Sequence, residues 1–292
     1  MEHHGFRITD SGESGAAMPD FSEVLRRYGV FREPLPVPAA YAGGGANGPL
    51  MAGLHTQATT ILAFKFCGGV LVAGDRRATA GNLLVYDRAD KVLEIDRYSL
   101  MAIAGVPATA WEMARMLEHS FQFYRRSQLQ ELSLDGKVRA LSKLLRDNLG
   151  FAMQGVGVVV PLFAAFDTAT AVPRLYFYDV MGAKFEVTDF AASGSGSPSV
   201  RAVLQYANAY GPRPMAKMNE EEALLLALRA LDTAAENDTA TGGVDRHGRV
   251  YPLVKIVNQQ GIATLPEAVL AKAYQRDLQS LPKNSRVLVE TE

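Results

Sequence analysis

The chain has 292 residues, of which 48% are hydrophobic and 21% are charged. These proportions are typical of a globular protein and exclude a wholly disordered, collagen-like or coiled-coil chain. Thirty Lys and Arg residues against 31 Asp and Glu residues give a net charge of −1, so no global field attracts nucleic acid or an anionic membrane. We therefore expect one large domain with an extension, and no nucleic-acid or membrane partner.

Cysteine and histidine usage gives no sign of a metal or disulfide site. The single cysteine, Cys67, cannot form an intrachain disulfide, and its apolar surroundings in the sequence predict a buried small hydrophobe. The five histidines lack zinc-ligand spacing, and neither a Walker loop nor a dinucleotide fingerprint occurs. The N-terminus carries no secretory signal pattern. We expect a cytoplasmic chain without metal or cofactor.

Residues 1–58 differ in composition from the remainder of the chain. The stretch FSEVLRRYGVF at residues 21–31 has the apolar spacing of one short helix. Residues 34–58 contain no charged side chain, and nine of these 25 residues are Gly or Pro, which is a linker composition. Residues 1–58 are therefore predicted to form an extension.

A β-rich body is predicted to begin at Thr59. TTILAFKF and GGVLVAGD alternate apolar with small or polar residues around a glycine pair, as a β-hairpin does. NLLVYD, KVLEI and SLMAIAG predict further short strands before any helix. This order favours an antiparallel or mixed sheet.

Blocks of helices and strands then alternate along the chain. Two amphipathic helices come first, followed by strands at VGVVVPLFAAFD, RLYFYDV and KFEVTDFA. A helix pair at SVRAVLQYANAYG and EEEALLLALRALDTAAE precedes a last strand, YPLVKIVN, and a helix from Pro266 to about Leu281. Segregated blocks of this kind predict a layered α+β sandwich. The predicted apolar faces of the first two helices comprise Met113, Met116, Leu117 and Phe121, and Leu141, Leu144, Leu145, Leu149 and Met153.

One segment is long enough to be considered as a membrane span. Residues 148–166 form 19 consecutive uncharged residues. Gly, Pro, Asn and Gln interrupt the run, so we interpret it as a helix end, a turn and a buried strand.

No single motif identifies a reaction. A GxSxG nucleophile elbow is absent, and SGSGS at residues 193–197 could cradle an anion but is more often a tight strand-to-helix turn. Several short motifs are ordinary one by one but specific in their order and spacing. They are TT (59–60), GDRR (74–77), DK (90–91), AIAG (102–105), GSGS (194–197) and DTATGG (238–243).

This set resembles the 20S proteasome β-subunit family, in its actinobacterial form, from Thr59 to about Leu281. The resemblance implies an α+β fold, the four-layer αββα sandwich of the Ntn hydrolases. It further implies a propeptide of residues 1–58, removed by self-cleavage between Ala58 and Thr59, and a catalytic domain of residues 59–292. In the family an N-terminal threonine exposed by this cleavage acts as the nucleophile of a threonine endopeptidase.

Spacing selects which threonine is the nucleophile. Asp75 and Lys91 follow Thr59 by 16 and 32 residues, as the catalytic Asp and Lys do in the family. Counting from Thr60 would reach Arg76 and Val92, which fit no family role. The resemblance also implies that the Gly105 N–H is an oxyanion donor and that Ser195, Asp238 and Thr241 organise the terminal amine and its water. Position 241 is often serine in the family.

Elementary chemistry agrees with these roles. A threonine hydroxyl needs a base within hydrogen-bond reach, and a free α-amino group, with an ordinary pKa of about 7.7–8.0, supplies one at the nucleophile itself. In the uncut chain that nitrogen is an amide, so the uncut protein would be a zymogen. A buried Lys91 would favour the neutral amine and the developing alkoxide, with Asp75 holding it in place.

The resemblance also implies a substrate site. An extended peptide would lie between Thr79 and residues 105–107, and the S1 pocket would be apolar. We therefore expect cleavage after hydrophobic residues of modest size. The predicted S1 walls are Ala78, Ala89, Leu93, Ile103, Pro107 and Trp111.

Two positions depart from the family pattern. Ala58 stands where glycine is usual, which predicts slow self-cleavage. Pro107 lacks a backbone N–H that normally donates to substrate, a bond of about 0.5–1.5 kcal/mol. Both keep open a non-catalytic structural β-subunit as an alternative. An HslV-like peptidase is a second alternative, although those chains are shorter and lack the C-terminal helix region.

The partners are implied by the resemblance alone. They are proteasome α-subunits and other β-subunits in an α7β7β7α7 barrel, an ATPase ring or other activator, and unfolded protein substrates.

Overall fold

The computed structural model describes residues 59–80, 83–244 and 250–278. The predicted helix at residues 21–31, the linker at 34–58 and the end of the last helix near Leu281 lie outside the described residues.

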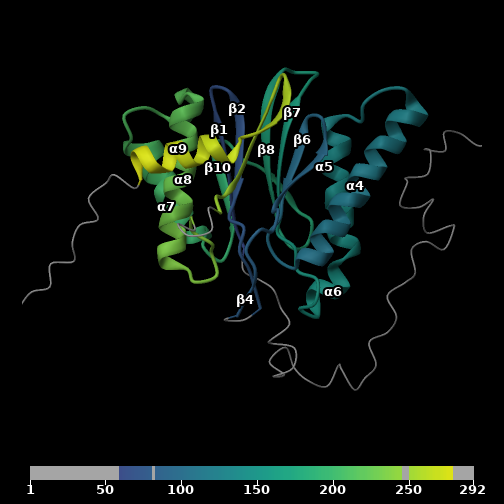
Figure 1. The fold of residues 1–292 in the computed structure, drawn as a ribbon. Coiled ribbons are helices and arrows are strands. Elements are labelled where there is room, and N and C mark those ends of the chain that lie inside the picture. The colour runs from purple at the N-terminus through teal and green to yellow at the C-terminus, as the bar shows by residue number, and fades with distance from the viewer. Residues whose placement is uncertain (1–58, 81–82, 245–249, 279–292) are drawn as a thin grey trace, which may run out of the picture. The chain divides into compact units, whose positions relative to one another are not determined.

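Two five-stranded antiparallel sheets form the centre of the described fold (Figure 1). In the first, the predicted hairpin pairs β1 with β2, with Phe66 opposite Gly69 at the turn. The order of this sheet is β10 (Phe190–Gly194), β1 (Thr60–Phe66), β2 (Gly69–Gly74), β11 (Leu253–Asn258) and β12 (Gly261–Thr264). The order of the second is β5 (Val92–Asp96), β6 (Ser99–Ala102), β7 (Leu162–Asp167), β8 (Val172–Tyr178) and β9 (Lys184–Glu186).

Helices cover the outer face of each sheet. Figure 1 shows α4 and α5 beside the second sheet, and α7, α8 and α9 beside the first. A capping box between Asn219 and Glu222 opens α8, which satisfies backbone donors that would otherwise lack partners. The helices are α4 (Pro107–Gln128), α5 (Leu134–Asp147), α6 (Leu149–Met153), α7 (Ser197–Tyr210), α8 (Glu220–Asn237) and α9 (Glu267–Asp277), with a 3-10 turn η1 (Met215–Lys217).

Hydrophobic clusters among the described residues bind the layers together. One joins α7, α8 and α9 to the first sheet through residues such as Leu231 and Phe64. A second joins α4 and α5 to the second sheet, with Leu117 and Phe163 among its members. A third lies between the two sheets and includes Val72. Helix, sheet, sheet and helix are therefore four layers, and the predicted α+β αββα sandwich is confirmed.

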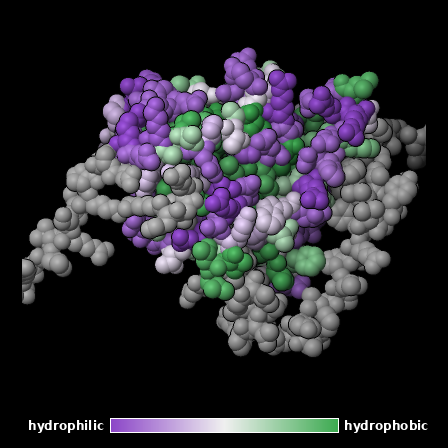
Figure 2. All heavy atoms as spheres, viewed as in Figure 1, coloured by the Kyte–Doolittle hydropathy of each residue, from purple (hydrophilic) through white to green (hydrophobic). Residues whose placement is uncertain are grey.

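A short two-stranded hairpin lies apart from both sheets. It pairs β3 (Ala78–Ala80) with β4 (Leu83–Tyr86). All four side chains of β4 are more than half exposed although all four are large and apolar. Figure 2 shows apolar surface at the lower rim of the view, where Figure 1 places β4.

Several local predictions were wrong. KFEVTDFA forms two strands, β9 and β10, in different sheets, and β12 was not predicted. The second amphipathic helix ends at Asp147, so Met153 does not extend its buried face and is 81% exposed. Cys67 is exposed at the β1–β2 turn, because the apolar residues around it belong to the strands and not to the turn.

In the uncharged segment 148–166 the predicted turn and buried strand are confirmed, whereas a separate short helix stands where the end of the preceding helix was predicted. The segment contains the short helix α6, a turn and most of the buried strand β7. In the part of the chain that the structure describes, no helix is both long and apolar enough to cross a membrane.

Candidate active site

A buried ion pair between Asp75 and Lys91 forms the base of the site. Asp75 follows β2 and Lys91 precedes β5, and Lys91 Nζ lies 2.6 Å from Asp75 Oδ1. The two side chains are 0% and 4% exposed. Lys91 Nζ also donates to the Arg77 carbonyl at 2.6 Å, and the backbone N–H groups of Arg77 and Gly242 donate to Asp75 Oδ2. With the Thr60 N–H on Oδ1, each oxygen of this carboxylate accepts two hydrogen bonds, as a buried charge requires.

Burial lowers the pKa of Lys91 below its ordinary value of 10.5, and the charge of Asp75 opposes this shift only in part. The ammonium is held next to its carboxylate but is less stable than it would be in water. A lysine of this kind can balance a negative charge that develops nearby and can release its proton below the usual pH.

A second charged group comes from the turn after α8. Asp238 Oδ2 accepts the hydroxyls of Ser195 at 2.6 Å and Thr241 at 2.5 Å, and its Oδ1 accepts the Ala240 N–H. Burial by itself raises the pKa of Asp238, but these hydrogen bonds outweigh it and hold the pKa below 3.8. The sequence predicted Ser195, Asp238 and Thr241 as a group, and the structure places its members together.

Thr59 lies beside this second group. Its carbonyl accepts the Ser195 N–H at 3.0 Å, and the residue is 3% exposed. Gly194 makes this approach possible, because it has a φ of 96° and a Cβ there would lie 1.8 Å from the Thr59 oxygen. The turn between β10 and α7 is therefore close to the start of β1.

Gly105 is fixed in a different way. It forms a bridge with Val159, its φ is 112°, and a Cβ on it would lie 2.0 Å from the Val158 oxygen. Only glycine fits this backbone. The described contacts of Gly105 do not include Thr59, so its role as oxyanion donor rests on the resemblance.

The predicted substrate-binding residues lie on β3, on β5 and on the segments next to them, and at the start of α4. Ala78 and Thr79 lie on β3, Ala89 is buried before β5, and Leu93 lies on β5. The Ile103 N–H donates to the Lys91 carbonyl at 2.9 Å.

Pro107 and Trp111 stand on the first turns of α4. Pro107 is at the N-terminal end of α4, where its fixed φ suits a helix start. Trp111 is 46% exposed, and its Nε1–H donates to the Asp90 carbonyl at 3.4 Å.

Sequence reasoning missed Arg77. Its guanidinium donates to the carbonyls of Thr239 at 2.9 Å and Thr241 at 3.2 Å, while its own carbonyl accepts Lys91. Arg77 thus connects the turn of Asp238 to the ion pair of Asp75. The GDRR motif contained this signal, but only its aspartate was assigned a role.

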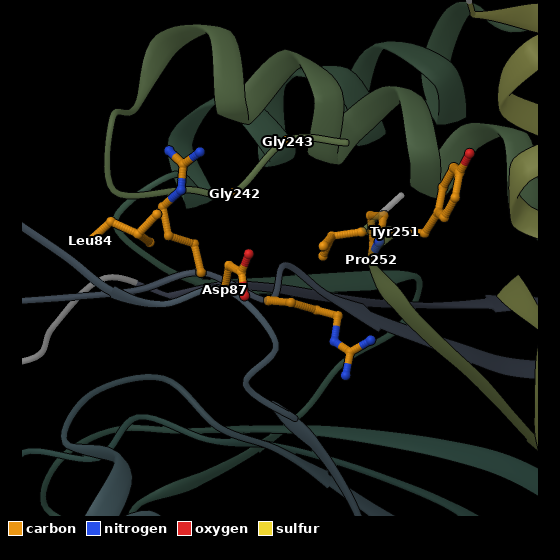
Figure 3. Close-up of a pocket in the computed structure, with 9 residues that line it drawn as sticks. Leu84, Asp87, Gly242, Gly243, Tyr251 and Pro252 are labelled. Atoms are coloured by element: carbon orange, nitrogen blue, oxygen red, sulfur yellow. The ribbon is translucent and has the colours of Figure 1, made fainter. Parts of the chain in front are cut away.

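A cavity of about 260 Å³ lies next to the ion pair, between the β3–β4 hairpin and the start of β11. Figure 3 shows Leu84 and Asp87 at one side, Tyr251 and Pro252 at the other, and the Gly242–Gly243 turn nearby. None of the predicted substrate-binding residues lines it. It is therefore separate from the predicted S1 pocket.

Comparison with known proteins assigns the family. A model of the family described as proteasome subunit matches residues 55–248. The chain belongs to the proteasome subunit family. Among its relatives, proteasome subunit beta 2 of Thermomonospora curvata is 42% identical over 214 residues, which are 73% of this chain and 74% of that protein.

Two further relatives extend the match. Proteasome subunit beta of Acidimicrobium ferrooxidans is 36% identical over 252 residues, 86% of each chain. Proteasome subunit beta of Streptomyces griseus is 38% identical over 231 residues, 79% of this chain and 80% of that protein. The predicted resemblance to the proteasome β-subunit family is confirmed, and the family is one of threonine-type peptidases.

Proposed function

We propose that this chain is a catalytic β-subunit of a 20S-type proteasome and hydrolyses peptide bonds with Thr59 as an N-terminal nucleophile. The observation that carries the proposal is the buried pair of Asp75 and Lys91 next to the start of β1, with a second carboxylate, Asp238, holding two hydroxyls nearby. A subunit that only assembled would not need to keep a desolvated ammonium whose pKa is lowered by burial.

The proposed reaction begins with the cut after Ala58, which turns the Thr59 amide into an amine. The Thr59 hydroxyl then attacks the substrate carbonyl carbon while the amine takes its proton. The peptide C–N bond breaks, the proton passes to the leaving amine, and an ester to Thr59 remains. Water, deprotonated by the same amine, hydrolyses the ester. Lys91 favours the neutral amine, and the Gly105 N–H stabilises the oxyanion.

The contacts of Thr60 support Thr59 as the nucleophile. The Thr60 N–H donates to Asp75 at 2.7 Å, its hydroxyl contacts Thr241 at 2.5 Å, and the residue is 0% exposed. Because Thr60 is buried and holds these hydrogen bonds, its side chain cannot reach a substrate unless the bonds break. Thr59 is the next residue toward the N-terminus.

We also propose that the subunit assembles with α-subunits and other β-subunits into a core particle, as the names of its relatives suggest for the family. An activator ring would deliver unfolded protein to the site, and the cytoplasm would be its location. The apolar walls at Ala89, Leu93 and Ile103 favour hydrophobic P1 residues.

The structural-subunit alternative predicts an assembled particle without peptidase activity. The test is hydrolysis of short fluorogenic peptides by particles assembled with the cognate α-subunit, with Thr59→Ala and Thr59→Ser as variants. We expect activity for the parent and for Thr59→Ser, none for Thr59→Ala, and a preference for hydrophobic P1 residues. Equal activity in parent and Thr59→Ala would refute the nucleophile, and preferred acidic or basic P1 residues would refute the pocket.

A further inference from the structure

Thr60 lies between the two charged groups of the site. Its N–H donates to Asp75 Oδ1 at 2.7 Å, and its carbonyl accepts the Asp75 N–H at 3.0 Å. Its hydroxyl points to the other group, with 2.5 Å between its Oγ1 and that of Thr241. One fully buried residue therefore contacts both the ion pair and the turn of Asp238.

Proton counting fixes the direction of these hydrogen bonds. A hydroxyl has one proton to donate, and Thr241 donates its proton to Asp238 Oδ2. Thr241 Oγ1 must then accept from Thr60. The Thr60 oxygen in turn accepts the Gly196 N–H at 3.0 Å. The bonds form a relay in one direction, from Gly196 through Thr60 and Thr241 to Asp238.

The relay is closely packed at its donor end. Gly196 is the N-cap of α7, where the helix dipole is positive. A Cβ on Gly196 would lie 2.6 Å from both Thr60 Oγ1 and Thr241 Oγ1. Each bond in such a chain polarises the next, so the relay leads from a positive helix end to a negative carboxylate.

We propose that Thr60 is a positioning residue. Its hydroxyl relay holds Asp238 and Thr241 at a fixed position relative to the Asp75–Lys91 pair. This inference rests on the proposed function and adds a residue to it. Thr60 does not touch substrate, because it is 0% exposed. Its hydroxyl should therefore affect kcat and the pH dependence of kcat, but not KM.

The test compares Thr60→Val, which keeps the shape but loses the hydroxyl, with Thr60→Ser, which keeps the hydroxyl. Only chains that begin at residue 59 by mass are compared. We expect Thr60→Val to lower kcat by about tenfold with KM nearly unchanged. At acid pH, below the range of the Thr59 amine, the further loss of activity on protonation of Asp238 should begin at a higher pH, because a less polarised Thr241 hydroxyl stabilises the Asp238 carboxylate less. Thr60→Ser, which keeps the hydroxyl, should keep the kcat and the pH profile of the parent. A purely structural role would lower Tm without moving the pH profile.

A double-mutant cycle between Thr60→Val and Asp238→Asn, measured by acid unfolding, tests the relay without using activity. Coupling of the two changes supports the relay, and additive effects would overturn it. Coupling in a parent without peptidase activity would refute the proposed function and leave the relay intact. An active parent with unchanged kcat and pH profile in Thr60→Val would overturn the inference while the proposed function stands.

Discussion

Burial of Lys91 affects both the stability of the fold and the proposed catalysis, because it lowers the pKa of this side chain. Because burial lowers its pKa, the folded chain loses this proton at a lower pH than the unfolded chain, whose value is 10.5. Between the two pKa values the unfolded chain binds more protons, so the free energy of unfolding rises with pH in that window. Catalysis that needs the ammonium should fall over the same window, below pH 10.5.

Lys91→Met tests this account. We expect peptide hydrolysis to fall by about 10²–10³-fold, as on removal of one electrostatic group from a catalytic site. In thermal melts at pH values below 10.5, the variant should no longer show the rise in stability with pH that Lys91 contributes. The matched control is Lys137→Met, because Lys137 is also a buried lysine in an ion pair, with Asp96 at 2.7 Å, but belongs to α5. Equal loss of activity in both variants would contradict a specific role for Lys91.

Pro107 stabilises the start of α4 but cannot donate the backbone hydrogen bond that substrate would accept. Its ring suits the first turn of α4 but removes an N–H that would donate to substrate. Pro107→Ala should lower KM or raise kcat/KM for short peptides, and lower stability by about 0.4–1 kcal/mol. Steady-state kinetics and denaturant unfolding measure the two effects. Unchanged kinetics would show that the missing bond is irrelevant.

At the scale of elements, the loop between β6 and α4 depends on Gly105. Gly105→Ala combines an unfavourable φ with a Cβ 2.0 Å from the Val158 oxygen, so the loop must move. We expect a large loss of kcat/KM together with a lower Tm. Gly155→Ala is the matched control, because its φ is 75° but no atom lies within 4 Å of the added Cβ. It should cost about 1–2 kcal/mol of stability and leave activity unchanged. Normal activity in Gly105→Ala would argue against the oxyanion role.

The elements that could be predicted are those whose pattern repeats. The β1–β2 hairpin and the apolar face of α4 follow from periods of about two and 3.6 residues. The split of KFEVTDFA could not be predicted, because alternation gives the face of a strand and not its partner. Val187 N–H donates to Leu175 in one sheet, whereas the Asp189 carbonyl accepts from Lys65 in the other. The chain therefore crosses from one sheet to the other between Val187 and Asp189.

At the scale of the whole molecule, the site brings together residues that are 181 positions apart in the sequence, such as Thr60 and Thr241. Spacing pointed to Asp75 and Lys91, and the family resemblance pointed to Asp238, because their side chains carry the chemistry. The hydrogen bonds that hold the site together come partly from backbone N–H groups, including those of Gly196 and Gly242. Almost every residue type offers such a donor, so no sequence pattern identifies them.

The central claim is that a cut before Thr59 creates the nucleophile. The decisive measurement is the intact mass and N-terminal sequence of the chain after co-expression with its cognate α-subunit. We predict a chain that begins at Thr59 and has lost about 6 kDa, the share of 58 residues in 31.6 kDa. A chain that begins at Thr60, or one that keeps its full length in an assembled particle, would contradict the account.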